Sequence, residues 1–160
     1  MRRLAALTVA AAGLCLSACG FTPLYGATAA GSSLTRVAVS TPDNRLGYRL
    51  REQLEDALGF DRSAPAQWRM QVEVEQERRP LGRRIDDTAT RYELTVRADW
   101  TLTPVGMGET RAGSETVTVT YAAADQPYAA IAAQQDGEER AAAELSRQIR
   151  LNLLRALGGR

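Results

Sequence analysis

The chain has 160 residues, enough for one domain with a modest core, and its 20 basic residues, all arginine, nearly balance 19 acidic residues. A formal net charge of +1 provides no overall positive field for nucleic acid, so a nucleic-acid-binding function is disfavoured. The sequence contains no histidine, which excludes Ser-His-Asp and Cys-His catalysis and His-ligated zinc.

The N-terminal segment has the three parts of an export signal. It opens with positive charge at Met1-Arg2-Arg3, continues with an apolar run, and ends with small residues at Leu16-Ser17-Ala18-Cys19-Gly20. The apolar run is shorter than the roughly 20 residues that a membrane-spanning helix needs, which disfavours a transmembrane anchor. We therefore expect residues 1–18 to be a signal peptide that is removed from the mature protein.

Cys19 makes this signal more specific. The order Leu16-Ser17-Ala18-Cys19 resembles the lipobox of bacterial lipoproteins, in which the cysteine sulfur is thioether-linked to diacylglycerol and the signal is cut just before it. The resemblance implies a mature protein that begins at Cys19, carries acyl chains such as palmitate, and is held on a membrane by them. The alternative is an ordinary secretory signal with a chance cysteine. Cys15 leaves with the signal, so the fold has to form without a disulfide.

The segment after the lipobox carries a family resemblance. Its sequence, Cys19-Gly20-Phe21-Thr22-Pro23-Leu24-Tyr25-Gly26, resembles the mature N-terminus of the LptE family of lipopolysaccharide-assembly lipoproteins, notably the alphaproteobacterial members. Small residues follow up to Ser33, a composition typical of a flexible tether. We therefore expect residues 19–33 to connect the lipidated cysteine to a single periplasmic domain over residues 34–160.

The resemblance implies a location, partners and a function. LptE-family proteins are outer-membrane lipoproteins that lie inside the LptD β-barrel as a plug, assist its assembly and help deliver lipopolysaccharide to the cell surface. The expected partners are thus an LptD-type barrel, lipopolysaccharide and the membrane, and neither a cofactor nor an enzymatic activity is expected. Gly20 follows the cysteine where aspartate often signals inner-membrane retention, which agrees with the outer membrane.

The domain begins with a predicted strand and helix. Residues 34–40 form a short β-branched run that favours a first strand, and Thr41-Pro42-Asp43-Asn44 supplies a turn with N-cap residues. Leucines then recur every four positions among charged residues, which predicts an amphipathic helix ending at Gly59. These leucines are Leu46, Leu50, Leu54 and Leu58. They would pack on the protein's own sheet or, alternatively, bind a partner helix.

Three later segments alternate strictly between apolar and polar residues, which is typical of strands with one buried face. Their apolar positions are Trp68, Met70, Val72 and Val74, then Tyr92, Leu94, Val96, Ala98, Trp100 and Leu102, and finally Val117, Val119 and Tyr121. The turn-prone sequence Pro104-Val105-Gly106-Met107-Gly108 separates the last two segments. The three segments therefore predict an antiparallel meander with one covered face.

Two arginine pairs lie between the first and second of these strands. Arg78, Arg79, Arg83 and Arg84 flank Pro80-Leu81-Gly82, which we interpret as the turn of a hairpin. Four guanidinium groups at one tip could bind phosphates or carboxylates bidentately, as the head of lipopolysaccharide requires. The alternative is a soluble hairpin tip that Asp86 and Asp87 partly neutralise.

The C-terminal part predicts a long helix. From Tyr128 to Leu157 the chain is alanine-rich, lacks proline and has only Gly137 as an interior breaker, which leaves open an interruption there. Its second half carries apolar residues at spacings of three and four, which predicts a face that covers the sheet. These residues are Ala142, Leu145, Ile149, Leu153 and Ala156.

Together these elements predict an α+β fold, a two-layer sandwich in the order β-α-β-β-β-α, with two helices on one face of a mostly antiparallel sheet of about four strands. Two other functions stay open. One is an accessory lipoprotein of an ABC-type lipid transporter, and the other is an enzyme that uses paired carboxylates. The acidic pairs Asp86-Asp87 and Glu138-Glu139 lie in polar stretches, so we interpret them as solvated surface residues.

Overall fold

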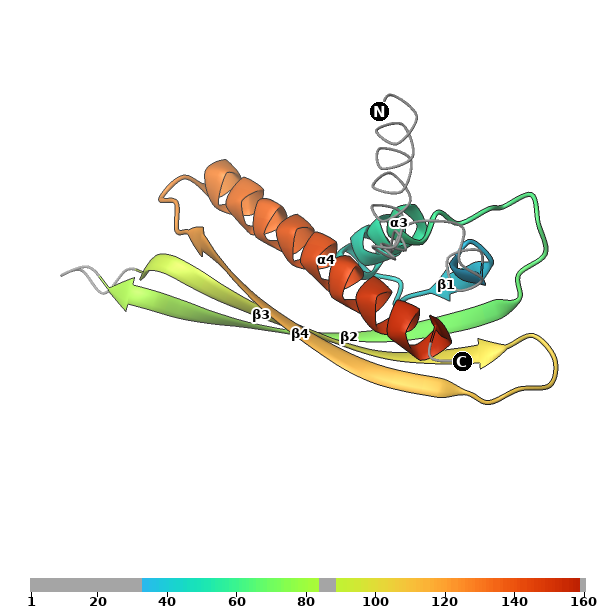
Figure 1. Cartoon of the computed structure of the whole chain (residues 1–160). Helices are drawn as coiled ribbons and strands as arrows, with labels where there is room; N and C mark the ends of the chain where they lie inside the picture. The colour runs from blue at the N-terminus through green and yellow to red at the C-terminus, as the bar shows by residue number, and fades with distance from the viewer. Residues whose placement is uncertain (1–32, 84–88, 159–160) are drawn as a thin grey trace, which may run out of the picture.

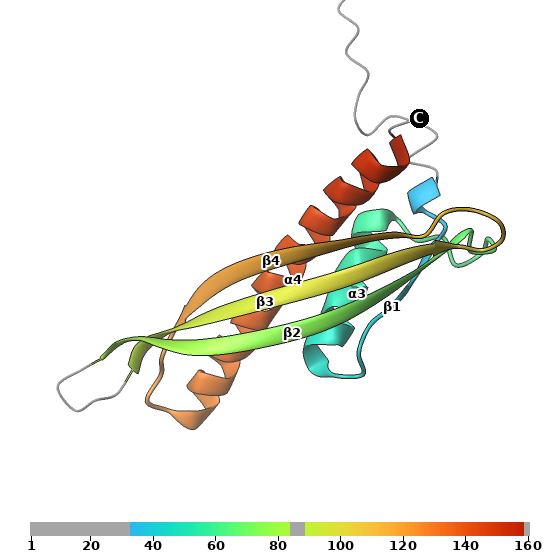
Figure 2. The same cartoon turned by 90° about the horizontal axis from the view of Figure 1, so that it is seen from below.

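The computed structural model describes residues 33–83 and 89–158, which form one four-stranded sheet and two long helices. The elements in chain order are β1 (Val37–Ser40), α3 (Arg45–Leu58), β2 (Trp68–Arg83), β3 (Ala89–Pro104), β4 (Arg111–Ala122) and α4 (Pro127–Gly158). Both helices lie on the same face of the sheet (Figures 1 and 2). The predicted α+β sandwich and its element order are confirmed.

The strands lie in the sheet in the order in which they occur in the chain. β1 is parallel to β2, whereas β2, β3 and β4 form an antiparallel meander. β2 and β3 have 16 residues each, so this pair is about 50 Å long. We call the end where Trp68 pairs with Pro104 the loop end, and the end where Arg83 pairs with Ala89 the hairpin end.

The register of the meander places the apolar residues of its three alternating strands on one face of the sheet. Met70 pairs with Leu102, and Val96 pairs with Val117, so apolar side chains of three strands share one face. The helices cover this face with side chains that are at most 4% exposed, among them Leu50, Leu54, Leu145, Ile149 and Leu153. We call the opposite, uncovered face of β2, β3 and β4 the open sheet face.

Helix α3 follows its sequence signals closely. The Asn44 side chain accepts a hydrogen bond of 2.8 Å from the Gly47 amide, which satisfies a backbone donor at the helix start. The helix ends at Gly59, whose φ of 65° is the left-handed conformation that favours glycine. The four predicted leucines are all buried, so they pack on the domain itself.

Helix α4 is continuous from Pro127 to Gly158, so Gly137 does not interrupt it. The ring of Tyr121 from β4 packs against this glycine, and a Cβ at position 137 would lie only 2.9 Å from Tyr121 Cδ1. Gly137 therefore allows the helix to approach the sheet closely. Ala142, Leu145, Ile149 and Leu153 are buried as predicted, while Ala156 is half-buried.

Two predicted boundaries are wrong. The first strand begins at Val37, because residues 33–36 form a short helical turn ahead of it, in which Leu34 is buried. The Pro80-Leu81-Gly82 sequence is not the hairpin turn, since β2 runs through it to Arg83. Proline is tolerated there because β1 ends opposite Gln71 and leaves the outer edge of β2 at Pro80 without a neighbouring strand in the described sheet.

Candidate functional site at the hairpin end

Arg78, Arg79 and Arg83 lie in the last part of β2, and Arg84 is the next residue in the sequence. At this end the β2–β3 hairpin extends beyond the other strands (Figures 1 and 2). Arg78 pairs with Leu94 and Arg79 with Glu93, both well inside the ladder. Arg83 is the last residue of β2, and Arg84 lies outside the described residues. Residues 79 and 83 are about 13 Å apart along an extended strand, so Arg79 does not lie at the tip of the hairpin.

Arg78 points to the helix-covered face and has several contacts. Its Nη1 donates a hydrogen bond of 3.2 Å to Gln134 Oε1 of α4. Its guanidinium also lies 4.9 Å from the ring centroid of Tyr92, a favourable cation–π contact. Arg78 therefore joins β2 to β3 and α4, in addition to any role toward a ligand.

Arg79 points to the open sheet face and is available to a ligand. Its side chain is 65% exposed, and its ion pair with Glu77 is a long contact of 4.0 Å. Such an exposed pair contributes little stability and exchanges readily. Neighbouring arginines thus face opposite sides of the sheet, because successive side chains of a strand alternate.

Glu138 of α4 is buried next to this site, so the interpretation of Glu138-Glu139 as a solvated pair is wrong for its first member. Glu138 is 6% exposed, accepts a 2.9 Å hydrogen bond from Gln134 Nε2, and forms a 3.4 Å ion pair with Arg45 of α3. These contacts connect Arg78 to α3 through Gln134. Asp86 and Asp87 lie outside the described residues.

The spacing of the sequence could have identified Glu138. It lies four residues before Ala142, which is the first member of the apolar stripe, so an extended stripe passes through position 138. The contribution of Gln134 depends on a contact with a residue 56 positions away, and no local pattern indicates such a contact.

A small hollow of about 280 Å³ lies in the same region, lined by Gln76, Arg78, Leu94, Tyr121 and Gln134. The Tyr121 ring lies 5.6 Å from that of Tyr92. Its hydroxyl is buried without a hydrogen-bond partner among the described residues. The lining combines one cation with amide and apolar groups, which is a composition for binding rather than for general acid–base chemistry.

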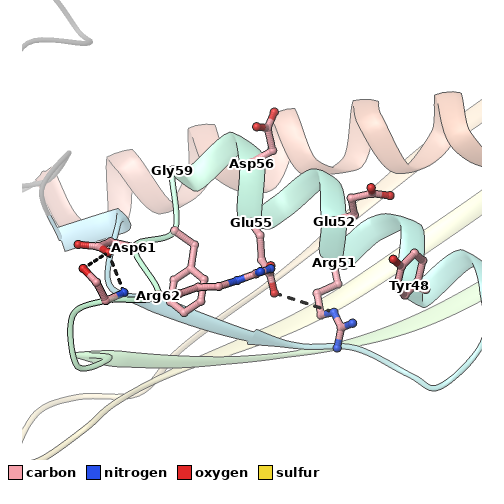
Figure 3. Close-up of a pocket in the computed structure, with 10 residues that line it drawn as sticks. Tyr48, Arg51, Glu52, Glu55, Asp56, Gly59, Asp61 and Arg62 are labelled. Carbon is pink, nitrogen blue, oxygen red and sulfur yellow. Dashed lines mark hydrogen bonds and ion pairs between the residues drawn. The ribbon is translucent and has the colours of Figure 1, made fainter.

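A larger open hollow of about 650 Å³ lies along α3 and the segment after it (Figure 3). Its charges compensate one another: Glu55 contacts Arg62 at 2.5 Å and Arg51 at 3.9 Å. Hydrogen bonds from Ser63 lower the pKa of Asp61. This arrangement ties the loop after α3 to the helix through ion pairs and hydrogen bonds.

The open sheet face is polar along its length. Thr95 and Thr118 share a hydroxyl hydrogen bond of 3.3 Å, and Arg97 binds both oxygens of Asp99. The hydrogen bonds between these last two groups raise the pKa of Arg97 and lower that of Asp99. Within residues 33–83 and 89–158, no cluster of His, Cys, Asp or Glu could hold a metal ion. The helices of this part are all too short or too polar to cross a membrane.

Comparison with known proteins gives one family and several similar structures. The family model described as LptE, lipopolysaccharide-assembly, matches residues 34–153. A crystal structure described as that of a lipoprotein from Caulobacter crescentus CB15 shares 44% identity, with a TM-score of 0.71 over 82% of this chain and 97% of that one. No curated protein matches the chain.

Two more distant structures are also similar. Rare lipoprotein B from Shewanella oneidensis is 17% identical, with a TM-score of 0.48 over 77% of this chain and 93% of that one. A lipoprotein B from Nitrosomonas europaea is 15% identical, with a TM-score of 0.42 over 76% and 81%. The match to the family model over residues 34–153 establishes the family without these two structures. The chain belongs to the LptE family of non-enzymatic lipopolysaccharide-assembly lipoproteins.

Proposed function

We propose that this protein is an outer-membrane lipoprotein, anchored through Cys19, that plugs an LptD-type β-barrel, helps it assemble and assists lipopolysaccharide delivery to the cell surface. Family membership over residues 34–153 supports the role in lipopolysaccharide assembly. The lipobox ending at Cys19 supports the lipid anchor. A partner barrel would hold the domain on the periplasmic side of the membrane or within the barrel lumen.

The observation that carries the plug proposal is the open sheet face. The lumen of an outer-membrane barrel is polar, so a domain that fits inside it needs a polar outside. Here the helices bury the apolar face of the sheet, and the other face presents threonines, paired charges and the exposed Arg79 to the surroundings. We therefore assign contact with the barrel wall to the open sheet face.

Lipopolysaccharide contact is proposed for the four arginines of the hairpin end. Arg79 is exposed, and Arg78 lines the small hollow, so both can approach a phosphate from different sides. Arg83 is the last residue of the same strand, and Arg84 is the next residue in the sequence. The proposal requires a ligand that spans the arginines, which agrees with the several phosphate and carboxylate groups of a lipopolysaccharide head.

The test of the function is co-purification of the full-length lipoprotein from detergent-solubilised outer membranes. We expect a stable one-to-one complex with a large β-barrel protein. Recovery of an ABC-type transporter and its substrate-binding subunit instead would contradict the plug role and favour a transporter accessory.

The test of the contact surface compares two exposed positions. Thr118→Arg places a bulky charge on the open sheet face, and Asp56→Arg places the same group on the outside of α3. We expect Thr118→Arg to reduce recovery of the barrel while Asp56→Arg leaves it unchanged, with both variants folded by circular dichroism. A Thr118→Arg complex recovered as well as the wild type would contradict the assignment of this face.

A further inference from the structure

The described domain begins at the loop end of the sheet. Val37, the first residue of β1, pairs with Trp68, which in turn pairs with Pro104 at the end of β3. Neighbouring strands are about 4.8 Å apart, so Val37 lies within about 10 Å of Pro104. The segment that carries the anchor therefore enters the domain beside the β3–β4 loop, residues 105–110.

The length of that segment restricts which end of the domain can meet the bilayer. Residues 19–32 number fourteen, so even fully extended they span at most about 50 Å. The hairpin end lies about 50 Å from the start of β1, the length of β2. The hairpin end could touch the bilayer only if this segment were stretched to its limit along the domain, whereas the loop end meets the bilayer without such extension.

The surface at the loop end suits a lipid interface. The Met107 side chain at the tip of the β3–β4 loop is fully exposed, and Val105 is 51% exposed. Gly106 and Gly108 flank Met107, and no charge occurs between Trp100 and Glu109. A second exposed apolar pair, Tyr128 and Ile131, lies at the start of α4 near the hairpin end, so exposure alone does not distinguish the two ends.

We propose that, in the lipidated protein before it meets a barrel, the β3–β4 loop is the membrane-facing surface, with Met107 and Val105 inserted into the interface of the bilayer that holds Cys19. This inference rests on the lipid attachment in the proposed function. Two apolar side chains are too few to hold a protein on a bilayer by themselves, so the loop orients a domain that the acyl chains already keep close. The hairpin end of the sheet then lies away from the bilayer surface.

The experiment places a fluorescent label at each end of the full-length, lipidated protein. Because the Cys19 sulfur carries the lipid, a maleimide fluorophore reacts only with a newly introduced cysteine. Met107→Cys labels the loop end, and Tyr128→Cys is the matched control, since it replaces another highly exposed apolar residue near the other end. Both proteins are reconstituted in vesicles of phosphatidylethanolamine and phosphatidylglycerol, with or without a lipid that carries a spin-label quencher on its acyl chain.

We expect the label at position 107 to lose fluorescence when the quencher lipid is present, while the label at position 128 keeps its intensity. Equal intensity at position 107 with and without quencher, in protein that floats with the vesicles, would overturn the inference. Quenching at position 128 alone would overturn it too and reverse the orientation. Protein that fails to float would instead contradict the lipid attachment itself, and the inference with it.

Discussion

Glu138 lies between the two helices, close to the arginines proposed to bind ligand. Its carboxylate accepts a hydrogen bond from Gln134, and its ion pair with Arg45 connects α4 to α3. Without Glu138, the Arg45 side chain, which is 47% exposed, can be solvated by water. The Gln134 amide, in contrast, loses the oxygen to which it donates its hydrogen bond. The main cost of removing Glu138 is therefore a broken hydrogen-bond network rather than a buried unpaired charge.

Glu138→Ala is expected to lower the free energy of unfolding by about 1–3 kcal/mol, measured by urea denaturation. Glu139→Ala is the matched control, because residue 139 is exposed on the same helix and the change in helix propensity is the same. The control should stay within about 0.5 kcal/mol of the wild type. Equal effects of the two substitutions would show that the Glu138 contacts contribute no stability.

Substitutions of Arg78 and of Arg79 are expected to differ in their effect on stability. Arg79→Gln should weaken lipopolysaccharide binding several-fold, on the order of 1 kcal/mol, without changing the unfolding temperature, since its side chain has little contact with the domain. Arg78→Gln should also lower the unfolding temperature, because it removes the contact with Tyr92 and alters the one with Gln134. The measurements are binding at fixed ionic strength and thermal unfolding.

The decisive variant for the ligand site replaces Arg78, Arg79, Arg83 and Arg84 together with glutamine. We expect it to stay folded and to lose more affinity than either single substitution. Unchanged lipopolysaccharide binding at matched ionic strength would reject the hairpin end as the ligand site, whatever the family of the protein.

At the scale of single elements, helix α3 depends on its N-cap. Asn44→Ala removes the acceptor of the Gly47 amide and should lower the free energy of unfolding by about 1 kcal/mol. Asn44→Asp should retain most of the stability, since aspartate caps helices equally well. An alanine variant as stable as the aspartate variant would show that the cap is dispensable, with denaturant unfolding as the measurement.

Helix α4 carries a half-buried carboxylate with a depressed pKa. Hydrogen bonds from Arg147 and then Gln148 lower the pKa of Glu144 from 4.5 to about 2. Because the folded-state pKa is the lower one, the ionised carboxylate stabilises the fold above about pH 4.5. This contribution is lost as the pH falls from about 4.5 to about 2.

The corresponding variant is Glu144→Gln. The side chain is 37% exposed and screened by solvent, so the wild type should exceed the variant by only a few tenths of a kcal/mol at pH 7. The difference should shrink below pH 4.5 and disappear at about pH 2, as measured by denaturation across this range. A difference that stays constant from pH 7 to pH 2 would mean that the carboxylate charge is irrelevant.

The elements differ in how far their sequence predicts them. Leucine spacing and the Asn44 and Gly59 signals define α3 completely, because each acts within a few residues. The extent of β2 was not predictable in the same way, since Pro80 and Gly82 are typical turn residues. Pro80 is acceptable in the strand because the described sheet has no strand beside β2 at that edge, which no local pattern indicates. The sequence suggested a break in α4 at Gly137. In the structure the helix is continuous, and the ring of Tyr121 from β4 packs where a side chain at position 137 would lie.

At the scale of the whole molecule, the domain has two different ends about 50 Å apart. The sequence predicts the α+β sandwich, since alternation in three strands and a stripe on each helix leave one way to bury the apolar side chains. It does not predict which end receives the anchor segment. That arrangement follows from the parallel pairing of β1 with the start of β2, a contact between residues about 30 positions apart.

The orientation and the proposed function both require lipid attachment at Cys19. Cys19→Ala should abolish metabolic labelling with palmitate and block removal of residues 1–18, because the thioether cannot form. Cys15→Ala is the matched control: it removes the other cysteine of the chain, which lies inside the expected signal, and should leave labelling unchanged. Palmitate incorporation by the Cys19→Ala protein, measured on a gel beside the unprocessed precursor, would refute the lipobox assignment, and with it the anchored plug.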